Sequence, residues 1–225
     1  MKNEIRASQE KIYKELYEKH KGTPMAVSSE SLAHKKVRFT KISEIFKDEE
    51  IINVHDVGMG LAGFYEFLLS EFPNKLINYS GSEILEEYVK DCSLKFPNNT
   101  FYNRDLSDGP GDEKYDYLIM SGVFHQRQDS TILEWEKFSQ RLIKNAFSMC
   151  KKGIALNFVS PFVDFYQPQI YYNNLPKLLN FINDDVSRFF EIKHNYALFE
   201  FTVFIYNQDF IKSSFPQNEL QKYFK

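Results

Sequence analysis

The chain has 225 residues, which suits one substantial α/β domain and is too short for two ordinary domains with a linker. Its net charge of −3 gives its surface no general attraction for nucleic acid or for an anionic membrane. No apolar run approaches the length that spans a bilayer. We therefore expect a small-molecule substrate as partner, with no nucleic acid and no membrane, and leave the oligomeric state open.

The amino-terminal region predicts helices in front of the main domain. Residues 4–20 carry apolar side chains at near-helical spacing, and Gly22 and Pro24 interrupt that pattern. A second helix is expected from about Ser31 to Phe46. The resulting division is a helical lid over residues 1–48, a main domain over 49–210 and a carboxyl-terminal tail over 211–225.

Cysteine usage and the start of the chain bear on the compartment. Only Cys92 and Cys150 are present, far apart in apparently helical segments, and no apolar segment follows the charged first residues. These features predict reduced thiols in a cytoplasmic protein and argue against a structural zinc site.

Strand and helix patterns alternate from residue 51 onward. Strands are expected at 51–57, 77–82, 100–103, 115–121 and 153–158, with helices at 62–71, 84–95, 131–150 and 175–183. This alternation predicts right-handed crossovers and a Rossmann-like, doubly wound parallel sheet with helices on both faces. Two further strands at 186–195 and 199–206 are joined too closely for a parallel crossover, so the seventh strand should run antiparallel.

The first two strands end in residues that suit a nucleoside-type cofactor. The first strand ends at Asp56 and is followed by a turn through Gly58 and Gly60, where a ligand can approach the main chain without meeting a Cβ atom. The second strand ends at Glu83, whose carboxylate can accept hydrogen bonds from two ribose hydroxyls.

The glycines alone do not identify the cofactor. Together with Gly63 they satisfy the GxGxxG pattern of dinucleotide-binding folds. A pyrophosphate is disfavoured by a nearby carboxylate, whereas the sulfonium of S-adenosylmethionine benefits from one. Asp56, immediately before the turn, therefore favours S-adenosylmethionine.

The ordered set of motifs resembles the class I S-adenosylmethionine-dependent methyltransferases over residues 35–207. It comprises Asp56-Val-Gly-Met-Gly60, Glu83, Asp105-Leu106, the strand 115–124 and the strand 151–158. Ser121-Gly-Val-Phe124, Ala155-Leu-Asn-Phe158 and Phe199-Glu-Phe-Thr-Val-Phe204 also look like the small methyltransferases of capsule and O-antigen biosynthesis.

The resemblance implies roles for individual residues. Asp105 would accept a hydrogen bond from the adenine amino group, although the turn at residues 107–109 offers it a capping role instead. Phe124 would wall the sulfonium, or else belong to the core. The implied cofactor-binding residues are Arg38, Asp56, Gly58, Gly60, Glu83, Ile84, Asp105, Leu106, Ser121, Gly122 and Phe124.

Methyl transfer needs a general base only if the acceptor must lose a proton. His125 and His194 are the candidate catalytic residues, and a packing role is the alternative for His125. The aromatic segment 160–174 after the fifth strand suits a substrate loop. The acceptor pocket is expected to be lined by Asn157, Phe158, Tyr171, Tyr172 and Tyr196.

These features predict a methyltransferase that O-methylates a small polar acceptor, such as a nucleotide-activated sugar or a capsule precursor. One version is a phosphoramidate oxygen, which would need no base. An NAD-dependent oxidoreductase is an alternative, although no YxxxK pattern follows the fifth strand. A non-catalytic partner subunit with the same fold is another, against which the complete set of Asp56, Gly58, Gly60 and Glu83 argues.

Overall fold

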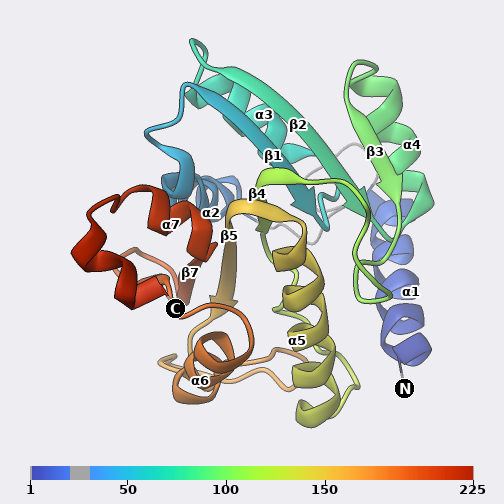
Figure 1. Ribbon diagram of the computed structural model, residues 1–225. Helices are drawn as coiled ribbons and strands as arrows, with labels where there is room; N and C mark the ends of the chain where they lie inside the picture. The colour runs from blue at the N-terminus through green and yellow to red at the C-terminus, as the bar shows by residue number, and fades with distance from the viewer. Residues whose placement is uncertain (1, 21–30, 225) are drawn as a thin grey trace.

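A seven-stranded sheet forms the centre of the protein, as the computed structural model shows (Figure 1). The structure describes residues 2–20 and 31–224, with side chains from residue 4 onward; the predicted break at Gly22 and Pro24 lies outside these residues. The strands are β1 (Ile51–Val57), β2 (Leu76–Glu83), β3 (Thr100–Asn103), β4 (Tyr115–Met120), β5 (Cys150–Val159), β6 (Phe190–Lys193) and β7 (Glu200–Tyr206).

The strand order is β3-β2-β1-β4-β5-β7-β6, and β7 alone runs in the direction opposite to the other strands. The helices are α1 (Lys2–His20), α2 (Leu32–Ser43), α3 (Gly63–Glu71), α4 (Glu86–Lys95), α5 (Ile132–Ser148), α6 (Leu175–Asp185) and α7 (Gln208–Ser213), with 3₁₀ helices at Glu44–Phe46 and Asn218–Phe224. The predicted doubly wound sheet with an antiparallel last strand is confirmed.

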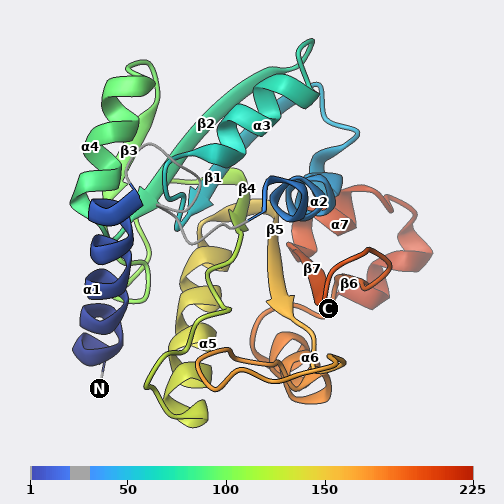
Figure 2. The ribbon, with the colours of Figure 1, turned by 180° about the vertical axis from the view of Figure 1, so that it is seen from behind.

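Helices cover both faces of the sheet because successive strand residues point to opposite sides. On one face, α2, α3 and α4 pack against side chains such as Val54 and Ile119. On the other, α5 and α6 pack against Leu118 and Leu156. Helix α1 packs beside α4, through the hydrogen bond from Tyr17 to Asp91, and its Ile5 joins the core cluster beneath α5 (Figures 1 and 2).

Local capping explains where the larger helices begin. Thr131 and Glu134 form a reciprocal capping box at the start of α5, which lies within the predicted range 131–150. Asn174 caps α6 through the backbone N–H of Lys177.

One prediction about the carboxyl-terminal part is wrong in extent. The strand expected at 186–195 is limited to β6, because Ser187 instead ends α6 by donating its backbone N–H to the carbonyl of Ile182. The segment predicted as a tail contains the end of α7 and a 3₁₀ helix whose Phe224 stacks on Phe189.

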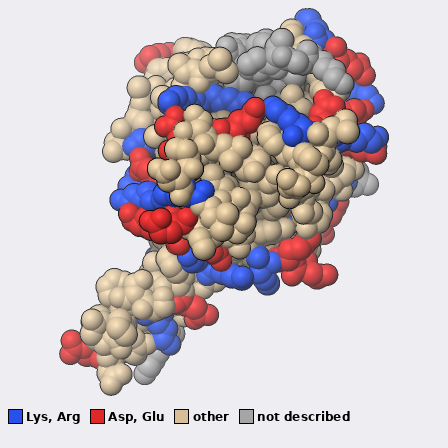
Figure 3. All heavy atoms as spheres, turned by 90° about the horizontal axis from the view of Figure 1, so that it is seen from above, with Lys and Arg blue, Asp and Glu red and all other residues tan. Residues whose placement is uncertain are grey.

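The surface seen from above carries interspersed basic and acidic side chains separated by broad uncharged areas (Figure 3). Among the residues coloured in that view, no wide area of one sign is visible. No helix in the described part of the chain is long and apolar enough to cross a membrane.

Candidate active site

A cavity of about 230 Å³ lies at the carboxyl ends of β1, β2 and β4. Every predicted cofactor-binding residue except Phe124 lines it, and so does His125. Helices α1, α2 and α5 complete its wall, through residues that include Gln9, Lys35 and Trp135. Residues from the first half of the main domain and from the amino-terminal helices therefore meet at one place.

The turn after β1 requires glycine for two different reasons. Gly58 and Gly60 have φ angles of +72° and +56°, in the left-handed region that disfavours other residues. A Cβ atom on Gly58 would also lie 2.8 Å from Cγ2 of Val123. The backbone N–H of Gly58 donates to the carbonyl of Ser82 at 2.8 Å, so the turn is fixed against the end of β2.

Asp56 places a buried carboxylate at the base of this turn. Its Oδ2 atom accepts a hydrogen bond from the Tyr79 hydroxyl at 2.8 Å, while Oδ1 is buried with no hydrogen-bond partner among the described residues. Burial raises the pKa of Asp56 to about 7. A carboxylate that lacks a partner beside a cavity favours a cationic group in that cavity and disfavours a phosphate.

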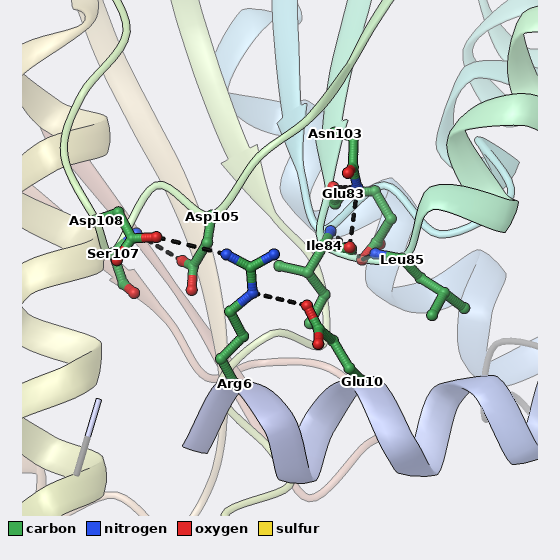
Figure 4. A network of polar contacts seen from close by, with 9 residues as sticks. All are labelled: Arg6, Glu10, Glu83, Ile84, Leu85, Asn103, Asp105, Ser107 and Asp108. Carbon is green, nitrogen blue, oxygen red and sulfur yellow. Dashed lines mark hydrogen bonds and ion pairs between the residues drawn. The ribbon is translucent and has the colours of Figure 1, made fainter. Parts of the chain in front are cut away.

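Glu83 turns its carboxylate back toward the backbone of Ile84 and Leu85, which follow it (Figure 4). Its oxygens accept from the backbone N–H groups of Gly60 at 3.0 Å and Ile84 at 2.7 Å. Burial raises the pKa of Glu83, although these N–H donors act in the opposite direction. A carboxylate accepts about four hydrogen bonds, so acceptor capacity remains for a ligand hydroxyl.

Asp105 and Leu106 follow β3 and form the far end of the cavity. The Oδ1 atom of Asp105 accepts the backbone N–H of Ser107 at 2.7 Å, so the turn-forming role considered from sequence is present (Figure 4). Leu106 is buried, and its carbonyl accepts from Asn145 on α5 at 2.6 Å. This bond fixes the loop that carries both residues.

Helix α1 closes the cavity, and the sequence predicted a helical lid there without identifying the residues that line the cavity. The Gln9 amide donates to the carbonyl of Gln126 at 2.7 Å, and Arg6 lies 3.5 Å from a carboxylate oxygen of Asp108 (Figure 4). Burial raises the pKa of Tyr13, on the same helix, to about 12. The near-helical apolar spacing predicts the helix but not the surface on which it docks.

Arg38 forms a buried ion pair that links α2 to the last strand of the chain. Its Nε donates to Glu200 at 2.8 Å, and Nη2 donates to the other Glu200 oxygen. Burial alone would lower the pKa of Arg38, but the Glu200 carboxylate outweighs it and raises that pKa. Glu200 lies within a segment quoted for the family resemblance, yet no local signal marks it as the partner of a residue 162 positions away.

Asn157 extends this ion pair toward β4. Its Oδ1 accepts the backbone N–H of Gly122 at 2.6 Å, and its Nδ2 donates to Glu200 at 2.8 Å and to Nε2 of His125 at 3.0 Å. Burial lowers the pKa of His125 to about 4, so the ring is neutral at pH 7. Asn157, expected to line the acceptor pocket, is instead fully buried.

Lys35 also lines the cavity, one turn before Arg38 on α2. A Cβ atom on Gly63, the first residue of α3, would lie 2.8 Å from the Lys35 ammonium. Burial lowers the pKa of Lys35. No ion pair joins Lys35 to a carboxylate of the described residues, so its charge is available to a ligand.

The structure places the other predicted site residues away from the cavity. Phe124 and Phe158 are buried and stack on each other at 5.0 Å, because apolar side chains at these strand ends complete the core beneath α5. The Tyr171 hydroxyl donates to Glu136 on α5, and the Tyr172 hydroxyl accepts from the backbone of Gln167. His194 and Tyr196 also have contacts outside the cavity. His194 lies against Phe162 and Phe201, and the Tyr196 hydroxyl is hydrogen-bonded to Thr202.

Comparison with solved structures identifies the fold as that of class I methyltransferases. A magnesium protoporphyrin IX methyltransferase from Synechocystis PCC 6803, solved with bound S-adenosylhomocysteine, superimposes with a TM-score of 0.60 at 14% identity, covering 92% of this chain and all of that one. The S-adenosylhomocysteine complex of DhpI superimposes with a TM-score of 0.62 at 11% identity, covering 89% and 95%. Human N-acetylserotonin methyltransferase superimposes with a TM-score of 0.57 at 17% identity, covering 76% of this chain and 52% of that one.

One sequence relative agrees with this fold. A protein of Mycobacterium tuberculosis, named "Putative methyltransferase", is 22% identical over 156 residues, which is 68% of this chain and 92% of that protein. No protein-family profile matches the chain.

Proposed function

We propose that this protein is an S-adenosylmethionine-dependent methyltransferase whose cofactor occupies the cavity at the ends of β1, β2 and β4. The observation that carries the proposal is the pair of buried carboxylates, Asp56 with its partnerless oxygen and Glu83 beside the glycine turn. A cationic nucleoside suits both, since the positive charge complements Asp56 and ribose hydroxyls complement Glu83. A pyrophosphate would meet Asp56 with like charge.

Different residues around the cavity suit different parts of this cofactor. Glu83 would hold the ribose, and Asp105 and Leu106 would take the adenine edge and face. Gly58 and Gly60 let the ligand approach the backbone, while Ser121 and Gly122 border the position of the transferred methyl group. The bound cofactor supplies an activated methyl group, and the chain supplies its orientation and the exclusion of water.

Lys35 is a better candidate than Arg38, the basic residue predicted to bind the cofactor, for the contact with the cofactor's carboxylate. Two guanidinium nitrogens of Arg38 are committed to Glu200, whereas Lys35 lies beside the first residue of α3 without an ion pair. The amino terminus of a helix also favours an anion. In this proposal α1 and α2 act as a lid over the cofactor, as expected for residues 1–48.

The acceptor is a small polar molecule, methylated on oxygen. The resemblance of Ser121-Gly-Val-Phe124 to enzymes of surface-polysaccharide synthesis favours a nucleotide-activated sugar or a capsule precursor. The cavity supports a small acceptor because Gln9, Tyr13 and Gln126 close it on the side away from the sheet. Its wall there combines amide groups with an aromatic face, which suits a polar ring.

Calorimetric titration with S-adenosylhomocysteine, with NAD in parallel, tests the cofactor. We expect a dissociation constant on the order of micromolar for S-adenosylhomocysteine and no binding of NAD. The substitution Glu83→Ala should remove the binding, and Glu86→Ala, at an exposed glutamate on α4, should leave it unchanged. Binding of NAD alone, or equal binding by the Glu83 variant, would overturn the proposal.

A further inference from the structure

The orientation of the Asn157 amide fixes the protonation of His125. A backbone N–H can only donate, so the atom of Asn157 facing Gly122 is the oxygen, and the amide nitrogen faces Glu200 and His125. That nitrogen donates to Nε2 of His125, which must therefore present its lone pair. A neutral His125 then carries its proton on Nδ1.

This arrangement prevents His125 from accepting a proton from a substrate. Nε2 is occupied by Asn157, and Nδ1 already bears hydrogen. The opposite tautomer would set the Nε2–H of His125 against the N–H of Asn157, and Asn157 cannot turn without losing Gly122 and Glu200. His125 is thus held as a hydrogen-bond donor, and it lines the cavity.

A second donor lies on the same wall. Arg38 uses Nε and Nη2 for Glu200, and its Nη1 atom lies 3.7 Å from the position a Cβ atom would take on Gly122. Both Arg38 and His125 line the cavity beside Gly122, where the transferred methyl group would sit. Two N–H donors on one wall of the cavity suit a ligand oxygen, and a guanidinium favours a charged one.

The other ionisable groups of the cavity leave no base for the acceptor. In the proposed function Asp56 and Glu83 face the cofactor, and Asp105 lies at its adenine end. Tyr13 is a weak acid whose pKa burial raises to about 12. Burial also raises the pKa of Tyr88, and the proposed function assigns Lys35 to the cofactor's carboxylate. Each of these lining groups therefore has a role other than removing a proton from a neutral hydroxyl.

We propose that Asn157 and Glu200 are positioning residues that hold His125 as a hydrogen-bond donor, and that His125 and Arg38 receive an acceptor whose reacting oxygen is already anionic. Such an oxygen belongs to a carboxylate or to a phosphate-type group. The inference rests on the proposed methyl transfer and names its substrate class. An oxygen lone pair forms the bond to the methyl carbon as the carbon–sulfur bond breaks, its electron pair stays on sulfur, and no proton is released.

Nitrogen-15 NMR of the histidine rings tests the positioning role in the ligand-free full chain, independently of cofactor binding. His125, identified by loss of its signals in His125→Asn, should show the Nδ1–H tautomer and stay neutral from about pH 5.5 to 8.5. Asn157→Asp should reverse the tautomer and raise the pKa of His125 by about one unit or more, because a carboxylate accepts where the amide donated. Asn183→Asp, at an exposed site, should change neither; an Nε2–H tautomer in the unmodified chain would overturn the inference.

Binding of simple acids to the protein saturated with S-adenosylhomocysteine tests the substrate class. Acetate or methylphosphonate should shift the Nδ1 signal of His125, whereas neutral acetamide should not. The acid that gives the larger shift indicates whether the acceptor is a carboxylate or a phosphate-type group. Of two matched variants, His125→Asn keeps a donor near the Nδ1 position and should bind the acid within about threefold, whereas His125→Gln should bind about tenfold more weakly. An equal response to acetamide, or no response to either acid, would overturn the proposed class; failure of S-adenosylhomocysteine to bind would instead refute the proposed function.

Discussion

The ion pair between Arg38 and Glu200 should contribute more to stability than any exposed pair of this protein. The two side chains retain only 20% and 11% of their exposure. Removing one partner of a fully buried pair costs about 3–5 kcal/mol, because the other charge stays buried without compensation. Since a fifth of Arg38 remains in water, we expect Arg38→Ala to cost about 2–3 kcal/mol. Glu200→Ala should cost about 3–4 kcal/mol, because it also leaves an Asn157 N–H unpaired.

A double-mutant cycle separates the pair from its surroundings. Urea unfolding at pH 7, followed by the fluorescence of the single, buried tryptophan Trp135 and by circular dichroism, should give a coupling energy of about 2 kcal/mol. The exposed pair Lys144 and Asp185, whose side chains are 50% and 49% exposed, is the control and should show less than about 0.5 kcal/mol. The expectation fails if each single substitution lowers the free energy of unfolding by less than about 1 kcal/mol and the double variant loses only the sum of the two.

Three further predictions concern the cavity. Gly58→Ala should destabilise the fold by about 1–3 kcal/mol and weaken S-adenosylhomocysteine binding, because the φ of Gly58 is positive and a Cβ atom there would lie 2.8 Å from a side chain. Gly109→Ala is the matched control, since a Cβ atom at Gly109 has nothing within 4 Å. Equal losses of stability in both variants would contradict the steric argument. Between the ordinary pKa of 3.8 and the folded value of about 7, unfolded Asp56 has released a proton that the folded chain holds. The free energy of unfolding should therefore fall as the pH rises through this window. In urea unfolding from pH 4.5 to 7.5, the stability of Asp56→Asn should rise relative to that of the unmodified chain. A stability difference between the two proteins that does not change with pH would contradict the raised pKa of the buried Asp56. Lys35→Met should weaken S-adenosylhomocysteine binding about tenfold in calorimetry while Lys36→Met, at an exposed ion pair, has no effect, and equal affinities would remove Lys35 from the site.

Local sequence carried much of the information about the cofactor end of the cavity. Asp56, Gly58 and Gly60 lie together because one strand and its turn hold them, and Glu83 follows from the parallel pairing of β2 with β1. Strand alternation and turn chemistry are short-range signals, so they can be recognised in one sequence.

The remaining wall depends on contacts that no short pattern encodes. Glu200 meets Arg38 only because β7 inserts beside β5, and Gln9 reaches the cavity only because α1 docks across it. Phe124 and Phe158 illustrate the converse difficulty. An aromatic residue at a strand end has the same sequence appearance whether it walls a pocket or completes a core.

A crystal structure of the protein with S-adenosylhomocysteine tests the central claim most directly. The ribose hydroxyls should lie within hydrogen-bond distance of the Glu83 carboxylate, the adenine against Leu106 and the amino-acid part between Asp56 and Lys35. A ligand bound elsewhere on the chain, or one that occupies the cavity without contacting Glu83, would contradict it.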